Sequence, residues 1–463
     1  MNRIFIAAPK SGSGKTSITI ALLETLKRRG VKCVSFKCGP DYIDPLFHQK
    51  VLGIPSYNLD TFFTSADVTK DLYLDHCRGF DAAVTEGVMG IFDGAGGMGE
   101  EGSSYDLASV TGDNIILVIE AKGACRSLIP LISGFISYDH KKLIKGVILN
   151  RCSKGVYEKL EPEILKLGIR PFGFLRNNKD LILPSRHLGL TLPSEIECIR
   201  EVIDSLCLEF NENVKVDELL ELTKDDSIVE KISSSGYLNN KNPQEDSAIE
   251  SPCTIAVARD DAFCFLYEDN LNLLKRFGAK IIFFSPISDE KIPGDADALY
   301  FPGGYPELFL EKLSINTSMK SSIKKAYDDG IPVFAECGGF MYLHDAITDA
   351  EGRRFETVGI VDSECEYTGR SVRFGYMSLC EKRPFFLGEG EIIKGHEFHY
   401  WDTKSVNDSC IASKPFTDNK YDCVIVNDHS WMGFPHLYFP SNPHFAKKFV
   451  EMAKSFRSEK INQ

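Results

Sequence analysis

The chain has 463 residues, more than one typical hydrophobic core holds, so we predict two or three domains. Hydrophobic residues make up 43% and charged residues 26%, which is typical of a globular protein and excludes a largely disordered one. The net charge of −13 without a basic stripe argues against a nucleic-acid partner. No segment is long and apolar enough to span a membrane. The 14 cysteines form no CxxC pair, as in a reducing compartment, so we expect a cytoplasmic protein with no membrane partner.

Short β-branched runs alternate with amphipathic stretches in the first half of the chain. We predict strands at residues 4–8, 33–37, 82–86, 115–119 and 146–150, and a helix at 17–29. This alternation is typical of a parallel sheet with helices on both faces. We therefore predict a first α/β domain over residues 1–222.

The composition changes between residues 223 and 252, where Ser, Asn, Lys and acidic residues dominate. Such a stretch is typical of an interdomain linker. A second α/β domain is predicted over residues 253–463, with strands at 254–258, 280–284, 298–301 and 332–335. A more β-rich segment then extends to about residue 442, and a helix at 445–456 closes the domain.

A glycine-rich motif lies between the first predicted strand and the first helix, the context that a P-loop requires. Its residues are Lys10, Ser11, Gly12, Ser13, Gly14, Lys15 and Thr16. The glycines let backbone N–H groups turn toward phosphate oxygens, Lys15 reaches the β and γ phosphates, and the Thr16 hydroxyl binds Mg²⁺. Pro9 stands where the standard motif has Gly, so the loop is a deviant P-loop. Lys10 is typical of the subclass that includes partition ATPases and dethiobiotin synthetase.

Two acidic positions support a magnesium site beside this loop. Asp41 follows the second predicted strand, and Glu86 ends the third. Nucleotide-bound Mg²⁺ is usually held by one or two carboxylates, so we predict Thr16, Asp41 and Glu86 as ligands. Asn150, which closes another predicted strand, is predicted to contact adenine.

A second motif predicts a cysteine nucleophile. Cys337 lies in the sequence AECGGF between a predicted strand and a helix, the arrangement of a nucleophile elbow. This turn exposes the side chain at the top of a sheet and directs helix N–H groups toward it. Gly303 and Gly304 follow a neighbouring strand, and their N–H groups are candidates for an oxyanion hole.

The base of such a site is expected to be a histidine. The candidates in the second domain are His396, His399, His429, His436 and His444. His436 lies late in this domain on a predicted strand, the order expected of a class I glutamine amidotransferase. We therefore select His436.

The motifs together resemble one known family over nearly the whole chain. They are APKSGSGKT, KCGPDYIDP, TEGVMGIFDG, LPSRHLGL, AVARDDAFCFLY, FPGGYPE, AECGGF, GHEFHY and HLYF. In these segments the chain resembles the cobyrinic acid a,c-diamide synthases, a family of corrin-pathway glutamine amidotransferases. The resemblance implies a dethiobiotin-synthetase-like P-loop domain with a parallel sheet, followed by a class I glutamine amidotransferase-like α/β domain.

The resemblance also implies a division of chemistry between the two domains. Cys337 attacks the glutamine amide, His436 shuttles protons, and ammonia travels internally to the first domain. There ATP with Mg²⁺ phosphorylates the a and c acetate carboxylates of a corrinoid, and ammonia displaces the phosphate. The expected partners are ATP, L-glutamine and a corrinoid polycarboxylate. Residues expected on the metal and substrate side are Asp41, Tyr42, Asp44 and Glu86, and further substrate contacts are predicted at Lys37, Arg126, Arg186 and His187.

Two departures from the general amidotransferase pattern are visible. Ala335 stands where class I domains have Gly, and the usual His-x-Glu becomes His436-Leu437-Tyr438, which leaves the third catalytic residue open. Alternative substrates for the same chemistry are hydrogenobyrinate and nickel-sirohydrochlorin. Cobyric acid synthase, which amidates other side chains, is a further alternative, but GPDYID and GHEFHY fit the a,c enzyme better. An alternative of another class is a partition-type nucleotide-switch ATPase with an inactive amidase domain, while dethiobiotin synthetase accounts only for the first domain. Because Lys10 reaches into a neighbouring subunit in related P-loop proteins, we also expect a homodimer.

Overall fold

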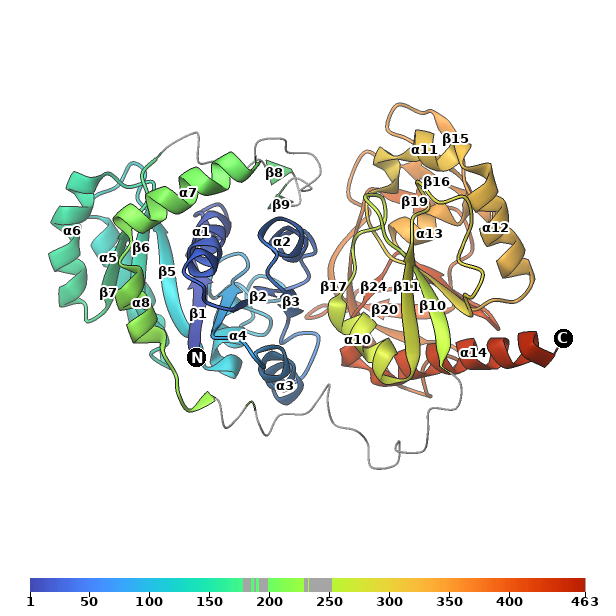
Figure 1. The fold of residues 1–463 in the computed structure, drawn as a ribbon, viewed down its shortest axis with the longest axis horizontal. Coiled ribbons are helices and arrows are strands. Elements are labelled where there is room, and N and C mark those ends of the chain that lie inside the picture. Colours follow the sequence, from blue (N-terminus) through green and yellow to red (C-terminus); the bar gives the residue numbers. More distant parts are fainter. Residues whose placement is uncertain (178–184, 187–188, 191–198, 229–231, 233–251, 463) are drawn as a thin grey trace. The chain divides into compact units, whose positions relative to one another are not determined.

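The computed structural model describes residues 1–177, 185–186, 189–190, 199–228, 232 and 252–462. The chain divides into two compact units, Met1–Asn240 and Lys241–Gln463, which Figure 1 shows in blue to green and in yellow to red. Most of the predicted linker, residues 223–252, lies outside the described residues. Each unit is therefore treated by itself. In the described part of the chain, no helix has the length and apolar character needed to cross a membrane.

Seven parallel strands form the sheet of the first unit, in the order β3-β2-β4-β1-β5-β6-β7. They are β1 (Asn2–Ala7), β2 (Cys33–Cys38), β3 (Ser56–Leu59), β4 (Ala82–Glu86), β5 (Asn114–Glu120), β6 (Ile144–Asn150) and β7 (Arg170–Phe174). All five predicted strands are present, whereas β3 and β7 were not predicted. The central strands are almost wholly buried, as expected for a parallel sheet covered on both faces.

Helices connect and cover these strands. They are α1 (Lys15–Arg28), α2 (Ile43–Phe47), α3 (Ala66–His76), α4 (Ser104–Thr111), α5 (Leu128–Tyr138), α6 (Lys154–Lys166), α7 (Ile199–Asn213) and α8 (Val216–Thr223). Helix α7 packs against α1 (Figure 1). A short hairpin, β8 (Ser185–Arg186) with β9 (Gly189–Leu190), precedes α7. The register places Glu86 beside Ile6 of β1 and Lys37 of β2, so the carboxyl ends of three strands meet at one edge of the sheet.

A second mostly parallel sheet organises the other unit, in the order β11-β10-β12-β13-β23-β22. Its strands are β10 (Cys253–Ala258), β11 (Ala279–Phe284), β12 (Ala298–Phe301), β13 (Val333–Glu336), β22 (Ile425–Val426) and β23 (Ser430–Gly433), of which only β22 is antiparallel. All four predicted strands are present. Side chains alternate between two apolar clusters, so that Phe334 of β13 packs on one face while Val333 and Ala335 pack on the other.

The β-rich segment forms two smaller sheets. One has the order β21-β20-β17-β18-β24 and contains β17 (Arg373–Glu381), β18 (Ile393–His399), β20 (Cys410–Ser413), β21 (Lys420–Cys423) and β24 (His436–Leu437). The other has the order β15-β14-β16-β19 and contains β14 (His344–Thr348), β15 (Arg354–Glu356), β16 (Val361–Tyr367) and β19 (Trp401–Thr403). The helical segments of this unit are α10 (Glu268–Arg276), η4 (Pro306–Leu308), α11 (Leu310–Ile315), α12 (Thr317–Asp328), α13 (Gly338–Tyr342), η5 (Phe439–Ser441) and α14 (Pro443–Asn462). The predicted α/β fold class is therefore confirmed for both units.

Candidate active sites

The glycine-rich loop adopts the turn that its sequence predicts. Gly12 and Gly14 have φ angles of 77° and 99°, in the left-handed region that favours glycine. Gly14 also begins α1, and a Cβ atom there would lie 2.0 Å from Asn150 Nδ2. Only glycine fits between this turn and the end of β6.

Asn150 supports the loop from the neighbouring strand. Its Nδ2 donates to the Ser13 carbonyl at 2.9 Å, and its Oδ1 accepts from the N–H of Arg151 at 3.0 Å. The loop is closed internally by a hydrogen bond from Ser13 Oγ to the Lys10 carbonyl at 3.0 Å. The predicted contact of Asn150 with adenine is therefore a further role for a side chain that already holds the loop, and it stays a prediction.

The two lysines of the loop have different surroundings. Lys15 is 8% exposed, and its Nζ donates to the carbonyls of Met89 at 2.6 Å and Lys10 at 3.4 Å. Burial, followed by repulsion from Lys37, lowers the pKa of Lys15 to about 8. The Lys10 side chain is 70% exposed and lies 3.5 Å from a Glu120 carboxylate oxygen. Backbone carbonyls thus hold Lys15 where the loop is expected to receive phosphate oxygens.

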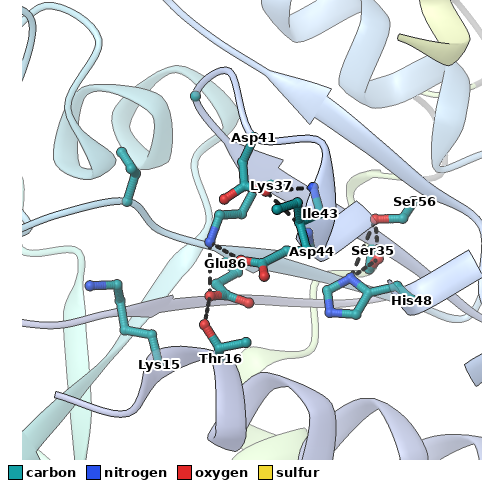
Figure 2. A network of polar contacts seen from close by, with 12 residues as sticks. Lys15, Thr16, Ser35, Lys37, Asp41, Ile43, Asp44, His48, Ser56 and Glu86 are labelled. Carbon is teal, nitrogen blue, oxygen red and sulfur yellow. Dashed lines mark hydrogen bonds and ion pairs between the residues drawn. The ribbon is translucent and has the colours of Figure 1, made fainter. Parts of the chain in front are cut away.

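Buried charges meet at the carboxyl ends of β2 and β4 (Figure 2). Glu86 Oε1 accepts from Thr16 Oγ1 at 2.6 Å and from Lys37 Nζ at 2.9 Å, and Lys37 also pairs with Asp44. Burial raises the pKa of Glu86. Its second oxygen, Oε2, is buried and accepts no hydrogen bond from the residues that the structure describes. A hydroxyl next to a carboxylate whose second oxygen has no protein partner among the described residues fits the ligand set of a nucleotide-bound Mg²⁺.

Asp41, the other predicted metal ligand, also holds the local backbone. Its Oδ1 accepts from the N–H groups of Ile43 at 2.9 Å and Asp44 at 3.1 Å, and so orients the start of α2. Burial, and then the Asp44 carboxylate, raise the pKa of Asp41 to about 7. Asn58 of β3, which the sequence did not single out, donates to the carbonyls of Gly39 at 2.9 Å and Asp41 at 2.6 Å.

The other predicted substrate contacts fall in three different environments. Tyr42 is buried at the start of α2. Arg126 is exposed, just before α5. Arg186 is described only by its backbone in β8, and His187 lies outside the described residues. Behind Asp44, the unpredicted His48 is buried, with Nδ1 3.0 Å from Ser35 Oγ, and burial lowers its pKa to about 4 (Figure 2).

In the second unit, Cys337 occupies a sharp turn between β13 and α13. Its φ of 44° and ψ of −107° are unusual for a residue with a side chain, and its N–H donates to the Gly433 carbonyl at 2.8 Å. A Cβ atom on Gly338 would lie 2.7 Å from Pro306 Cδ, and one on Gly339 would lie 2.2 Å from the Phe301 carbonyl oxygen. The two glycines after Cys337 therefore let α13 begin directly against the end of β12, as a nucleophile elbow requires.

The Gly303–Gly304 turn packs between this elbow and His436. A Cβ atom on Gly303 would lie 2.2 Å from His436 Cε1, and one on Gly338 would lie 3.0 Å from the Gly304 nitrogen. A Cβ atom on Gly304 would lie 2.1 Å from the Ala262 carbonyl oxygen. The backbone of this turn is thus in contact with both the elbow and the imidazole.

His436 lies on β24, opposite His396 of β18, and the two rings stack with their centroids 5.0 Å apart. Burial, followed by His396 and His399, lowers the pKa of His436 well below its ordinary value. Burial, followed by the Glu307 carboxylate, raises the pKa of the Cys337 thiol. The resting site therefore holds a neutral thiol and a neutral imidazole.

The remaining candidate histidines are held by other partners. His396 Nδ1 lies 3.4 Å from Tyr267 Oη, and His399 stacks on Phe434, with Nδ1 2.6 Å from the Trp401 carbonyl. His429 and His444 lie beside carboxylates, 2.8 Å from Asp428 and 2.9 Å from Glu391 respectively. Only His436 packs against the Gly303 backbone.

One side chain that the sequence did not single out lies directly before the cysteine. Glu336 is 1% exposed, accepts from Tyr300 Oη at 2.8 Å and accepts from the Leu437 N–H at 2.7 Å. Tyr438, which replaces the usual glutamate, donates instead to Asp269 at 2.9 Å. A buried acid between two apolar residues in the AECGGF segment was the available signal.

Two domain families cover these two sites. Residues 4–190 match the CobQ/CobB/MinD/ParA nucleotide binding domain, and residues 254–443 match the CobB/CobQ-like glutamine amidotransferase domain. The protein therefore belongs to the class in which one chain joins a nucleotide-binding domain to a glutamine amidotransferase domain.

Relatives that align over the whole chain narrow this class. Three cobyrinate a,c-diamide synthases are each 36% identical to this chain. The alignment covers 98% of this chain and 99% of the relative from Caldanaerobacter subterraneus subsp. tengcongensis, 96% and 97% for Listeria innocua, and 97% and 98% for Picrophilus torridus. The chain belongs to the cobyrinate a,c-diamide synthase family, which confirms the resemblance of its motifs.

Proposed function

We propose that the protein amidates the a and c acetate carboxylates of cobyrinate, with ATP as the activator and glutamine as the nitrogen donor, as a step of cobalamin biosynthesis. The carboxylate attacks the γ-phosphate of ATP and releases ADP, which leaves an acyl phosphate. Ammonia then attacks the acyl carbon, and phosphate leaves as the amide forms. A carboxylate is a poor electrophile, and the phosphate supplies the leaving group that it lacks.

The ammonia is proposed to come from Cys337 and His436. His436 accepts the thiol proton as Cys337 Sγ attacks the amide carbon of glutamine, and the oxyanion that forms is stabilised by N–H groups of the Gly303–Gly304 turn. The imidazolium returns the proton to the leaving ammonia. Water then hydrolyses the thioester to give glutamate and the free thiol. His436 is neutral in the resting site, so its imidazole can take the proton as the bond between Cys337 and the amide carbon forms.

In the first unit, Lys15 is proposed to bind the β and γ phosphates, with Ser11, Gly12 and Gly14 supplying loop N–H groups. Thr16, Asp41 and Glu86 are proposed to hold Mg²⁺, which when bound neutralises charge on the phosphates. Asp41 also keeps the start of α2 in place, as its two backbone hydrogen bonds support. Lys37 at the end of β2, and Tyr42 and Asp44 at the start of α2, are proposed to face the carboxylate substrate.

Two organisational proposals accompany this function. We propose domains at residues 1–222 and 253–463 joined by a linker at 223–252. We also propose a homodimer, supported by the exposure of Lys10, which related P-loop proteins extend into a neighbouring subunit. A sedimentation experiment that shows a monomer both with and without ATP would contradict the proposed homodimer.

The observation that carries the proposal is the Cys337 elbow, with its positive φ and with His436 packed on the Gly303 turn. The nucleotide-dependent switching of a partition-type ATPase does not require a cysteine nucleophile with a histidine beside it. The test is to incubate the purified full-length chain with ATP, Mg²⁺, glutamine and cobyrinate, and to follow the product by mass spectrometry. Two successive mass decreases, each replacing a hydroxyl by an amino group, are expected.

The other outcomes separate the alternatives. Glutamine hydrolysis without a change in the corrinoid contradicts cobyrinate as the substrate and redirects the assay to hydrogenobyrinate and nickel-sirohydrochlorin. Absence of both reactions contradicts the amidotransferase and favours the nucleotide-switch ATPase.

A further inference from the structure

The segment that carries His436 has few backbone partners of its own. Strand β24 contains only His436 and Leu437, and it pairs along one edge with β18. Side chains complete its attachment. Asn270 of α10 donates to the Leu437 carbonyl at 2.8 Å and accepts from the Phe439 N–H at 2.8 Å. The Tyr438 N–H donates to the Lys394 carbonyl, and the Leu437 N–H donates to Glu336.

Glu336 makes its two hydrogen bonds to different elements. Oε1 accepts from the Leu437 N–H at 2.7 Å, and Oε2 accepts from Tyr300 Oη on β12 at 2.8 Å. Burial raises the pKa of Glu336 to about 8. Removing a carboxyl group that binds a buried N–H destabilises the folded protein, since the N–H is then left buried without a hydrogen-bond acceptor.

The position of Glu336 in the chain gives these bonds a consequence for the site. Its backbone ends β13 and leads directly into Cys337, while its side chain holds the residue that follows His436. Glu336 therefore connects the turn that carries Cys337 to the strand that carries His436. The usual acidic partner two residues after the histidine is absent, because Tyr438 stands there and bonds to Asp269.

We propose that Glu336 is a positioning residue of the glutaminase site, which sets the spacing between Cys337 and His436 through the Leu437 N–H. This inference rests on the proposed glutaminase function. It assigns to Glu336 no contact with glutamine and no proton transfer. Its effect is on the geometry of proton exchange between thiol and imidazole, where a displacement of about 1 Å costs about 100-fold in rate.

The test compares two substitutions in the full-length protein, one that keeps the length of the side chain and one that keeps its carboxyl group. Glu336→Gln keeps the length of the side chain, since the amide oxygen can accept from Leu437 and the amide nitrogen can donate to Tyr300. Glu336→Asp keeps the carboxyl group but is one methylene shorter, so it cannot bridge both partners. We expect E336Q to keep glutaminase kcat within about threefold of wild type, because both hydrogen bonds remain. We expect E336D to lose about 10- to 100-fold in kcat with an unchanged KM for glutamine.

Three controls distinguish positioning from a general structural role. Tyr300→Phe removes the other hydrogen bond of the carboxyl without touching β24, and is expected to leave kcat unchanged. Ammonia-dependent amidation by E336D should equal that of wild type, because this reaction bypasses Cys337. Below about pH 7, where Glu336 is protonated and uncharged, the pH profile of kcat for E336Q should match wild type, since Glu336 transfers no proton.

Several outcomes would overturn the inference. Wild-type kcat in E336D, equal losses in E336D and E336Q, or a parallel loss of ammonia-dependent amidation in E336D would each contradict positioning through the Leu437 N–H. A wild-type chain without glutaminase would overturn the proposed function as well, which distinguishes the two failures.

Discussion

The protonation of the Lys15 side chain is expected to depend on whether ATP is bound. In the structure it is buried against two backbone carbonyls, and burial followed by Lys37 lowers its pKa to about 8. A bound triphosphate supplies the opposite charge and favours the ammonium form. The free protein therefore loses this proton near pH 8, whereas the ATP complex keeps it to higher pH.

ATP affinity is consequently expected to fall as pH rises above about 8, approaching a tenfold loss per pH unit. Calorimetric titration at pH 8.5 in two buffers of different ionisation enthalpy should show proton uptake on ATP binding. Lys15→Arg is the matched control, because a guanidinium stays protonated in this range and should show no such uptake. Equal ATP affinity at pH 7 and pH 9 in the wild-type protein would contradict the expected titration.

The resting cysteine has the opposite character to a preformed thiolate. Burial and the Glu307 carboxylate raise its pKa, so Cys337 is a neutral thiol until a substrate arrives. We expect iodoacetamide at pH 7 to label the exposed Cys125 before Cys337. An electrophilic analogue of glutamine should instead label Cys337 first, because it binds beside His436. Peptide mass spectrometry gives both orders, with Cys337→Ser as the control for the labelled site. Preferential iodoacetamide labelling of Cys337 would contradict the neutral resting state.

Gly303 shows how a turn fixes the base. There is no room for a Cβ atom between this turn and the His436 ring, since the two would be 2.2 Å apart. Gly303→Ala is therefore expected to displace the imidazole and lower glutaminase kcat by about 100-fold, with ammonia-dependent amidation unchanged. Gly294→Ala is a matched control in the same unit, because a Cβ there meets no described atom within 4 Å. Initial rates of glutamate release measure both variants, and equal rates would show that the ring tolerates the extra methyl group.

The elements that carry the two motifs were predictable from the sequence because each combines an apolar run with a glycine turn. The predicted strands at 4–8 and 332–335 correspond to β1 and β13, which lead into the P-loop and the Cys337 turn. Strands β3 and β7 were missed, because the first contains Asn58 and the second contains both Pro171 and Gly173, residues that weaken a strand pattern.

The side-chain partners within the sites were less predictable. Asn58 lies on the missed strand β3, so its hydrogen bonds to the Asp41 loop had no visible pattern. Glu336 bonds to a backbone group 101 residues away, and such a partner depends on tertiary structure. Asn150 was singled out correctly as a strand-end residue, but its amide holds the Ser13 carbonyl, a contact that only the loop conformation reveals.

In the whole molecule, the two sites belong to different compact units, each with its own sheet. The P-loop and Glu86 share the edge of the seven-stranded sheet, whereas Cys337 ends a strand of the six-stranded sheet. Neither set of described side chains requires the other for its hydrogen bonds. A substitution that inactivates the site of one unit should therefore abolish the partial reaction of that unit and leave the partial reaction of the other unit intact.

Two substitutions test this independence. Cys337→Ser is expected to abolish glutamine-dependent amidation while ammonium salts still support synthesis, because the first unit needs only ammonia. Lys15→Ala is expected to abolish both syntheses, since the phosphates lose their cation, yet to retain measurable glutamine hydrolysis. Product mass and glutamate release, measured on the same folded preparations, report the two partial reactions separately. Loss of ammonia-dependent synthesis in C337S, in a protein whose thermal unfolding matches wild type, would show that the cysteine also serves the synthetase reaction and that the chemistry is not divided between the units.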